Sequence, residues 1–175
     1  LLEKEGKRLR FEIGVGMGSD PEAVEVRNLE ATVNKILKNS LKEYTPDASL
    51  NNIIRQLGLL FKAERAYIFE KNADNTDSNT YEWVAEGISP EKDNLQNVPP
   101  ETAQGWYDAF NAGKTITIEN IEDIKEEDPV LYATLKPQHI TSLVVVPLYS
   151  HEKIIGLFGV DNPEAVRLDF ALDLI

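Results

Sequence analysis

The chain has 175 residues, with 30 acidic against 18 basic side chains, a net charge of −12 and no cysteine. This length suits one domain with an appendage, and a net charge of this sign repels nucleic-acid phosphates and anionic lipid. The sequence therefore predicts neither a nucleic-acid partner nor membrane insertion. No apolar run approaches the ~20 residues of a membrane span and no signal peptide opens the chain, so the cytoplasm is favoured.

Residues 1–45 are predicted to form a unit of their own, with a strand over 8–16 and a long helix from about 21 to 44. The glycine-rich stretch between them, residues 14–18, is like a phosphate-cradling loop. Its spacing is not G-x-G-x-x-G, however, and Asn34 stands where an acidic ribose partner would be needed. A plain strand-to-helix turn is therefore favoured, and a third interpretation makes residues 1–40 the tail of a preceding cyclase-like domain.

The next part of the chain alternates helices and strands. Thr45-Pro46-Asp47 predicts a helix start, and the following helix to about Lys62 carries one apolar stripe. Strands are predicted over 65–70 and 81–87 around a polar insert, then a short strand over 94–98. A helix opened by Pro99-Pro100, a strand over 115–118 and a helix capped by Asp128 follow.

The segment 143–162 predicts a buried hairpin. Two runs rich in branched residues flank the polar turn at 150–153, and neither run alternates apolar with polar residues. Both faces of the sheet must therefore be covered, which leaves room for a ligand between the layers.

This hairpin, S-L-V-V-V-P-L followed by I-I-G-L-F-G-V-D-N, resembles the closing hairpin of GAF domains, the small-molecule sensor modules of bacterial signalling proteins. The upstream elements occur in the order that this family uses. The stretches N-T-Y-E-W, D-N-L-Q-N-V-P and G-V-D-N-P are similar to GAF modules attached to diguanylate cyclase-type proteins. The resemblance covers residues 46–175.

The resemblance implies an α+β fold with an antiparallel sheet of about six strands. Helices would cover one face, and ligand-pocket loops and short helices the other, after a long N-terminal helix. It also implies a regulatory sensor that binds a small molecule and passes a helix rearrangement to an output domain. The alternative is a ligand-free module for dimerisation and signal transmission. Because the chain starts without methionine and stops inside a predicted helix, we expect a piece of a longer protein.

A cavity is predicted between the sheet and the segments 94–110 and 128–140. Its candidate ligand-binding residues are aromatic side chains with a polar group and two polar anchors: Trp83, Asn97, Trp106, Tyr107, Tyr132 and Ser142. A compact, partly apolar ligand is expected. A polyanion is disfavoured because Lys114 and Lys136 are the only cationic side chains within the cover.

Other chemistries find little support. The absence of cysteine excludes a thioether-linked bilin and the thiolate chemistry of free methionine sulfoxide reductases. His139 could be an axial haem ligand, but solvent-exposed histidines at 139 and 151 are favoured. The acidic run 119–128 lacks calcium-loop spacing, and Asn34-Lys35 lies in the wrong element for cyclic GMP. No nucleophile or base constellation is present, so we expect no catalysis, no metal and no cofactor.

A homodimer through the N- and C-terminal helices is the remaining prediction. The N-terminal helix carries a heptad seam through Val26, Leu29, Val33, Ile36 and Ser40, beside a second stripe through Leu37, Leu41 and Tyr44. One stripe can pack on the chain itself and leave the seam to a second copy, reinforced by the C-terminal helix. The alternative is that both stripes fold back on the chain's own core.

Overall fold

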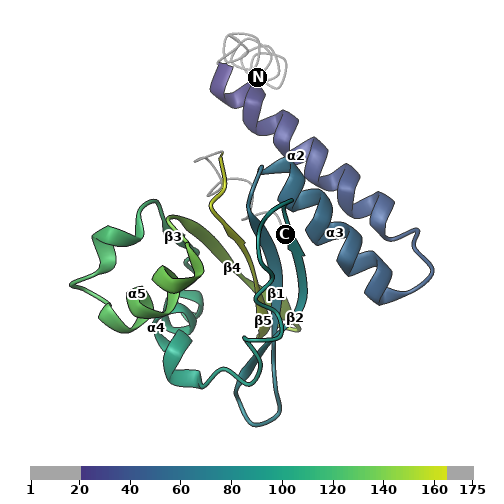
Figure 1. The fold of residues 1–175 in the computed structure, drawn as a ribbon. Coiled ribbons are helices and arrows are strands. Elements are labelled where there is room, and N and C mark those ends of the chain that lie inside the picture. Colours follow the sequence, from purple (N-terminus) through teal and green to yellow (C-terminus); the bar gives the residue numbers. More distant parts are fainter. Residues whose placement is uncertain (1–20, 165–175) are drawn as a thin grey trace, which may run out of the picture.

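The computed structural model describes residues 21–164, and their side chains from residue 27 onward (Figure 1). The predicted strand over 8–16, the glycine-rich stretch 14–18 and the C-terminal helix predicted from Pro163 lie wholly or mostly outside the described residues. The described part is an antiparallel sheet between a pair of helices and a layer of short helices and loops.

Two helices precede the sheet, α2 (Pro21–Ser40) and α3 (Pro46–Leu60). The predicted helix start is confirmed. Thr45 is the N-cap of α3: its side-chain oxygen accepts a hydrogen bond from the Ala48 amide at 3.2 Å, and Pro46 lies in the first turn. The two helices pack on each other and α3 lies against β1 and β2. They cover one face of the sheet.

The sheet has the strand order β2-β1-β5-β4-β3, and every pair is antiparallel. Its strands are β1 (Arg65–Lys71), β2 (Asp77–Val84), β3 (Ile116–Ile118), β4 (Leu143–Ser150) and β5 (Lys153–Asp161). The predicted hairpin is confirmed. His151 and Glu152 form its two-residue turn with φ of 47° and 65°, because a tight hairpin turn needs positive φ at both positions.

Two predictions about strands were wrong. Residues 94–98 do not form a strand; they make turns and one bridge between Val98 and Asp77, so the described sheet has five strands. The polar insert also ends earlier than predicted, because β2 begins at Asp77 and continues through an irregularity in its pairing opposite Ile68 and Phe69. Such a bulge lets residues of both parities along β2 reach the same face.

The other face of the sheet is covered by α4 (Pro100–Asn111), η1 (Ile121–Ile124), α5 (Pro129–Leu135) and η2 (Lys136–Gln138). We call these elements, with the turns at 85–99, the cover. Asp128 caps α5 as predicted, accepting a hydrogen bond from the Leu131 amide at 2.9 Å. Gly113 follows α4 with φ of 72°, a conformation that side chains disfavour.

Alternation along β1 separates two cores. Ala66 and Ile68 pack with α2 and α3, whereas Tyr67 and Phe69 pack with the cover. The described residues bury three charged side chains, Arg65, Asp77 and Asp161, and all three lie on the cover side of the sheet. The two faces of one sheet therefore differ in chemistry.

The helix seam predicted to form the dimer faces the chain's own core. Val33 is 1% exposed and belongs to the helix-side core, with Leu29 and Ile36 packed against it. In this chain Val33 is therefore not an interface residue, and the prediction that assigned this stripe to a second copy was wrong. The apolar side chains left exposed at this end are Leu41, Tyr44 and Leu59.

Candidate functional site

A cavity of about 80 Å³ lies between the sheet and the cover, where the sequence predicted it. Strands β1, β2 and β5 form one wall, and residues 91–106 and 131–140 of the cover form the other. Its apolar lining includes Phe69, Leu95, Val98, Trp106, Leu131 and Leu157. One water molecule needs a cavity volume of about 10–15 Å³, and an engineered cavity of about 150 Å³ holds benzene. The cavity therefore suits a small molecule.

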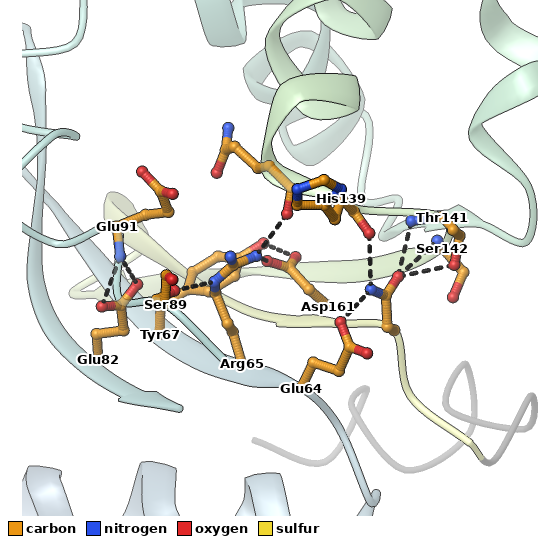
Figure 2. Close-up of polar contacts among 12 residues, drawn as sticks. Glu64, Arg65, Tyr67, Glu82, Ser89, Glu91, His139, Thr141, Ser142 and Asp161 are labelled. Carbon is orange, nitrogen blue, oxygen red and sulfur yellow. Dashed lines mark hydrogen bonds and ion pairs between the residues drawn. The ribbon is translucent and has the colours of Figure 1, made fainter. Parts of the chain in front are cut away.

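Arg65, the first residue of β1, places a guanidinium in this lining. The side chain is buried and lies 3.6 Å from the Asp161 carboxylate. Its Nε donates a hydrogen bond to the Ser89 carbonyl, and an Nη donates to the Gln138 carbonyl, both at 3.2 Å. Figure 2 shows Arg65 with its contacts to Ser89 and Asp161. One side chain thus connects the sheet to two separate segments of the cover.

Asp161, the last residue of β5, is held by a second contact from β1. The Tyr67 hydroxyl donates a hydrogen bond to Asp161 Oδ1 at 2.9 Å. Gly159, paired with Tyr67, makes room for the ring, because a Cβ at position 159 would lie 2.3 Å from it. Burial raises the pKa of Asp161 from 3.8 to about 7, although the Tyr67 hydrogen bond and the Arg65 charge oppose the shift.

A second carboxylate, Asp77, lies at the start of β2 and is 2% exposed. The Tyr107 hydroxyl on α4 donates to Asp77 Oδ1 at 2.7 Å, whereas Asp77 Oδ2 has no partner. Burial raises the pKa of the Asp77 carboxyl, opposed by this hydrogen bond and by the Lys71 charge. The pKa of the Tyr107 hydroxyl is raised by burial and by Asp77, so it stays a donor.

Two more lining residues carry buried atoms without partners. Asn79 Nδ2 donates to Glu82 Oε1 at 3.3 Å, but Asn79 Oδ1 accepts nothing. Trp106 Nε1 on α4 donates to no protein group. With Asp77 Oδ2, these are the three buried side-chain polar atoms without a hydrogen bond among the described residues, and all three belong to residues that line this cavity.

Of the six candidate ligand-binding residues, Trp106 lines the cavity and Tyr107 adjoins it by holding Asp77. Trp83 lies on the opposite face, against Gly58 of α3. Asn97 is an exposed turn residue with φ of 52°. The remaining two, Tyr132 and Ser142, also lie outside the lining: the Tyr132 hydroxyl donates to Glu122, and the Ser142 amide donates to Asn162. Five of the six thus do not line this cavity.

The sequence analysis counted Lys114 and Lys136 as the cationic side chains within the cover and did not consider Arg65. Both are exposed and neither lines the cavity, whereas Arg65 does. The signal for Arg65 was present in the alternation Arg65-Tyr67-Phe69, which puts the arginine on the same face as two aromatic residues. Asp77 and Asn79 were assigned to a loop, so no alternation pattern was considered that could have predicted their burial.

Asn162, directly after β5, joins several segments of the chain through its side chain. Its side-chain oxygen accepts from the Thr141 and Ser142 amides at 2.7 and 3.1 Å, and its Nδ2 donates to the His139 carbonyl and to Glu64. Two residues on, the Glu164 amide donates to the Phe61 carbonyl after α3. The cover, the end of β5 and the end of α3 are therefore joined at one place.

Haem and metal ions do not fit the described residues. His139 is exposed with its ring outside the cavity lining, and His151 lies in the hairpin turn. Within residues 27–164, no three histidine or carboxylate side chains gather as a metal-ion site. In the acidic run, Glu122 is engaged by Lys136 and Tyr132. Among the described residues, no helix is both long and apolar enough to cross a membrane.

The chain is 29% identical over 129 residues to the methanogenesis regulatory histidine kinase FilI of Methanothrix harundinacea. The match covers 70% of this chain but spans only 14% of the kinase's length. The fold is similar to the phycocyanobilin-bound GAF domain from a cyanobacterial phytochrome, with a TM-score of 0.68, 15% identity and coverage of 83% and 88%. It is also similar to the blue-light absorbing form of the Thermosynechococcus elongatus PixJ GAF domain, with a TM-score of 0.60, 18% identity and coverage of 73% and 77%.

A bilin does not fit this chain. The 175 residues contain no cysteine for a thioether, and the cavity of about 80 Å³ is far below the roughly 300–1,000 Å³ of pockets for drug-sized ligands. The shared fold nevertheless agrees with the match of a family model to residues 45–174. The chain belongs to the GAF domain family, the family that its closing hairpin resembles.

Proposed function

We propose that this chain is the ligand-binding sensor of a signal-transduction protein, and that a compact small molecule binds in the cavity under the cover. The observation that carries the proposal is the set of three unpaired buried atoms on Asp77, Asn79 and Trp106 around one cavity. Native proteins pair nearly all such atoms with protein groups, water or ligand. A space filled only by its own side chains, as in the ligand-free alternative, would not need them.

Binding would act on the chain's own contacts. A molecule in the cavity would touch the residues whose side chains hold the cover, above all Arg65, which contacts Ser89 and Gln138 as well as Asp161. Asp161 precedes Asn162, whose side chain holds residues 139–142. A shift of the cover would therefore displace the segment that follows β5, and this segment is hydrogen-bonded to the end of α3.

The output domain belongs to the same proposal. The kinase relative is about seven times longer than the matched region, which supports a parent protein in which this module controls a separate domain. A histidine kinase or a diguanylate cyclase-type domain would each suit a sensor of this kind. We place the parent's sensor in the cytoplasm, and propose a homodimer that uses the apolar side chains left exposed at the helical end, Leu41, Tyr44 and Leu59.

The sensor proposal is tested by filling the cavity. Ala103 is a half-buried lining residue of α4, and Ala103→Leu would occupy the space. Ala133 on α5 is exposed, so Ala133→Leu is a matched control with the same added volume. Thermal unfolding of each protein would be followed with a set of small metabolites that spans charge and size.

The proposal predicts at least one compound that raises the melting temperature of the wild type and of Ala133→Leu but not of Ala103→Leu. No stabilising compound, or one that stabilises Ala103→Leu equally, would favour the ligand-free transmission module instead. Circular dichroism would check that both variants fold.

A further inference from the structure

The unpaired atoms around the cavity have a definite polarity. Asp77 Oδ2 and Asn79 Oδ1 are hydrogen-bond acceptors, and both come from β2. Because they are two residues apart on one strand, their side chains leave the same face about 7 Å apart. Trp106 Nε1 on α4 is a donor. A complementary ligand therefore offers donors toward β2 and an acceptor toward α4.

The charges of the lining indicate the sign of the ligand. Four carboxylates, Asp77, Glu82, Glu91 and Asp161, line the cavity with one cation, Arg65. Arg65 is engaged by Asp161 and by two backbone carbonyls. The surplus negative charge of the cavity favours a cation over an anion.

Among the four carboxylates of the lining, Asp77 is the one with a buried oxygen that a ligand could pair. Glu82 already accepts hydrogen bonds from the Glu91 and Lys92 amides at 3.0 to 3.1 Å. The Lys71 ammonium lies over the Tyr107 ring, 3.8 Å from its centroid, and Asp77 keeps an unpaired oxygen. Burial removes water from around the Asp77 carboxylate and so raises the pKa of this carboxyl. A bound cation would replace the missing solvation.

We infer, on the basis of the proposed function, that the ligand is a compact protonated amine that also carries a hydroxyl or carbonyl oxygen. Its ammonium group donates to Asp77 Oδ2 and Asn79 Oδ1, its oxygen accepts from Trp106 Nε1, and its carbon chain packs on Phe69 and Leu157. The cavity volume of about 80 Å³ limits it to roughly four to six non-hydrogen atoms unless the cover moves.

Three probes of nearly equal size and different charge test this inference. They are 3-aminopropan-1-ol, the neutral propane-1,3-diol and the anion 3-hydroxypropanoate, each titrated into the full chain at pH 7.5 by isothermal calorimetry. Ligands of about five non-hydrogen atoms bind at best with micromolar dissociation constants. We expect the amine to bind in the micromolar-to-millimolar range and at least about tenfold more tightly than either other probe.

Two variants locate the contacts, each with a matched control. Asp77→Asn should weaken amine binding at least about tenfold, whereas Asp108→Asn, an exposed carboxylate on α4, should leave it unchanged. Trp106→Phe should weaken binding by roughly three- to tenfold through loss of one donor, whereas Trp83→Phe on the opposite face should not. If Asp77→Asn fails to fold, the Trp106 pair and the ranking of the probes still decide.

The outcomes separate this inference from the function on which it rests. Tighter binding of the diol or the anion overturns the amine class but supports a ligand-binding cavity. Failure of all three probes to bind at 10 mM, roughly the weak limit for such fragments, overturns the amine inference at this size. The cavity-filling comparison at Ala103 then judges the sensor function separately. Equal binding to wild type and Asp77→Asn would show a site elsewhere.

Discussion

The two faces of the sheet bury different kinds of side chains. The face toward α2 and α3 is closed by apolar contacts from residues such as Ile54, Leu57 and Phe61, each at most 1% exposed. The face toward the cover buries Arg65 and Asp161 beside a cavity. Both faces share the same strands and the same alternation, so the difference lies in the side chains that the sequence places on each.

Burying polar groups is costly unless each finds a partner. The helix-side face avoids the cost, since Ser40 is its buried polar side chain at the α2 end and Asn52 donates to its hydroxyl. The cover-side face bears the cost at three atoms, on Asp77, Asn79 and Trp106. These are the atoms that the proposed ligand would pair.

The largest expected effect comes from the ion pair of the cover-side face. At pH 8, Arg65→Met should lower the free energy of unfolding by about 3–5 kcal/mol, because Asp161 must then stay buried as an unpaired charge or take up a proton from the solution. The double variant Arg65→Met/Asp161→Asn should recover most of this loss. Urea denaturation of the four proteins forms the cycle. A double variant as unstable as Arg65→Met would mean that Arg65 acts through the cover carbonyls instead.

The pH dependence of stability tests the same pair without changing its packing. The folded-state pKa of Asp161 is raised from 3.8 to about 7. The folded state therefore holds this proton more tightly than the unfolded state, and the resulting stability is complete below about pH 4 and lost as pH rises through 7. Relative to Asp161→Asn, the wild type should lose about 1 kcal/mol of unfolding free energy per pH unit between pH 5 and 7.

The measurement is a urea denaturation series on wild type and Asp161→Asn at pH 5, 6, 7 and 8. Taking the difference between the two proteins removes the contributions of other titrating groups. Two curves that run parallel across this range would show that Asp161 is ionised throughout and that the Arg65 charge outweighs burial.

Two helical glycines compare the packing of the faces directly. Gly58 of α3 lies under Trp83, where a Cβ would come within 2.2 Å of the ring, whereas Gly105 of α4 has no neighbour within 4 Å of such a Cβ. Gly58→Ala should lower the free energy of unfolding by about 1–3 kcal/mol through overpacking. Gly105→Ala should raise it by about 0.5–1 kcal/mol through helix propensity. Chemical denaturation of both variants checks the pair, and equal signs would contradict the packing difference.

The smallest expected effect is on the unpaired indole. Trp106→Phe removes a donor that has no protein partner, so it should change the free energy of unfolding of the ligand-free protein by about 1 kcal/mol or less. Thermal and urea unfolding of this variant provide the check. A larger loss would mean that Trp106 serves the core more than the cavity.

Much of the fold could be predicted because local signals are strong. The caps at Thr45 and Asp128 start helices where expected, and the unalternating runs around His151 form the predicted hairpin. The prediction of a short strand over 94–98 was wrong, since these residues make turns and a single bridge to Asp77.

The site could be predicted only in position. Aromatic content pointed to the cover, but aromatic residues serve packing as readily as binding, as Trp83 and Tyr132 do. Asp77 and Asn79 were assigned to a loop because they lie in the polar stretch 72–79, whereas β2 begins at Asp77. The Val33 stripe shows a related limit: a heptad seam does not say whether its partner is another copy or the chain's own α3.

The chain has two tryptophans, Trp83 on the helix side of the sheet and Trp106 on the cover side. Their signals can show on which face a small molecule binds. Their indole N–H signals can be followed by ¹H–¹⁵N NMR while 3-aminopropan-1-ol, propane-1,3-diol or 3-hydroxypropanoate is added, with Trp106→Phe assigning the signals. The account predicts that a saturating probe shifts the Trp106 signal and leaves the Trp83 signal in place. Signals that both stay fixed with every probe, or a Trp83 signal that moves as far as that of Trp106, would contradict it.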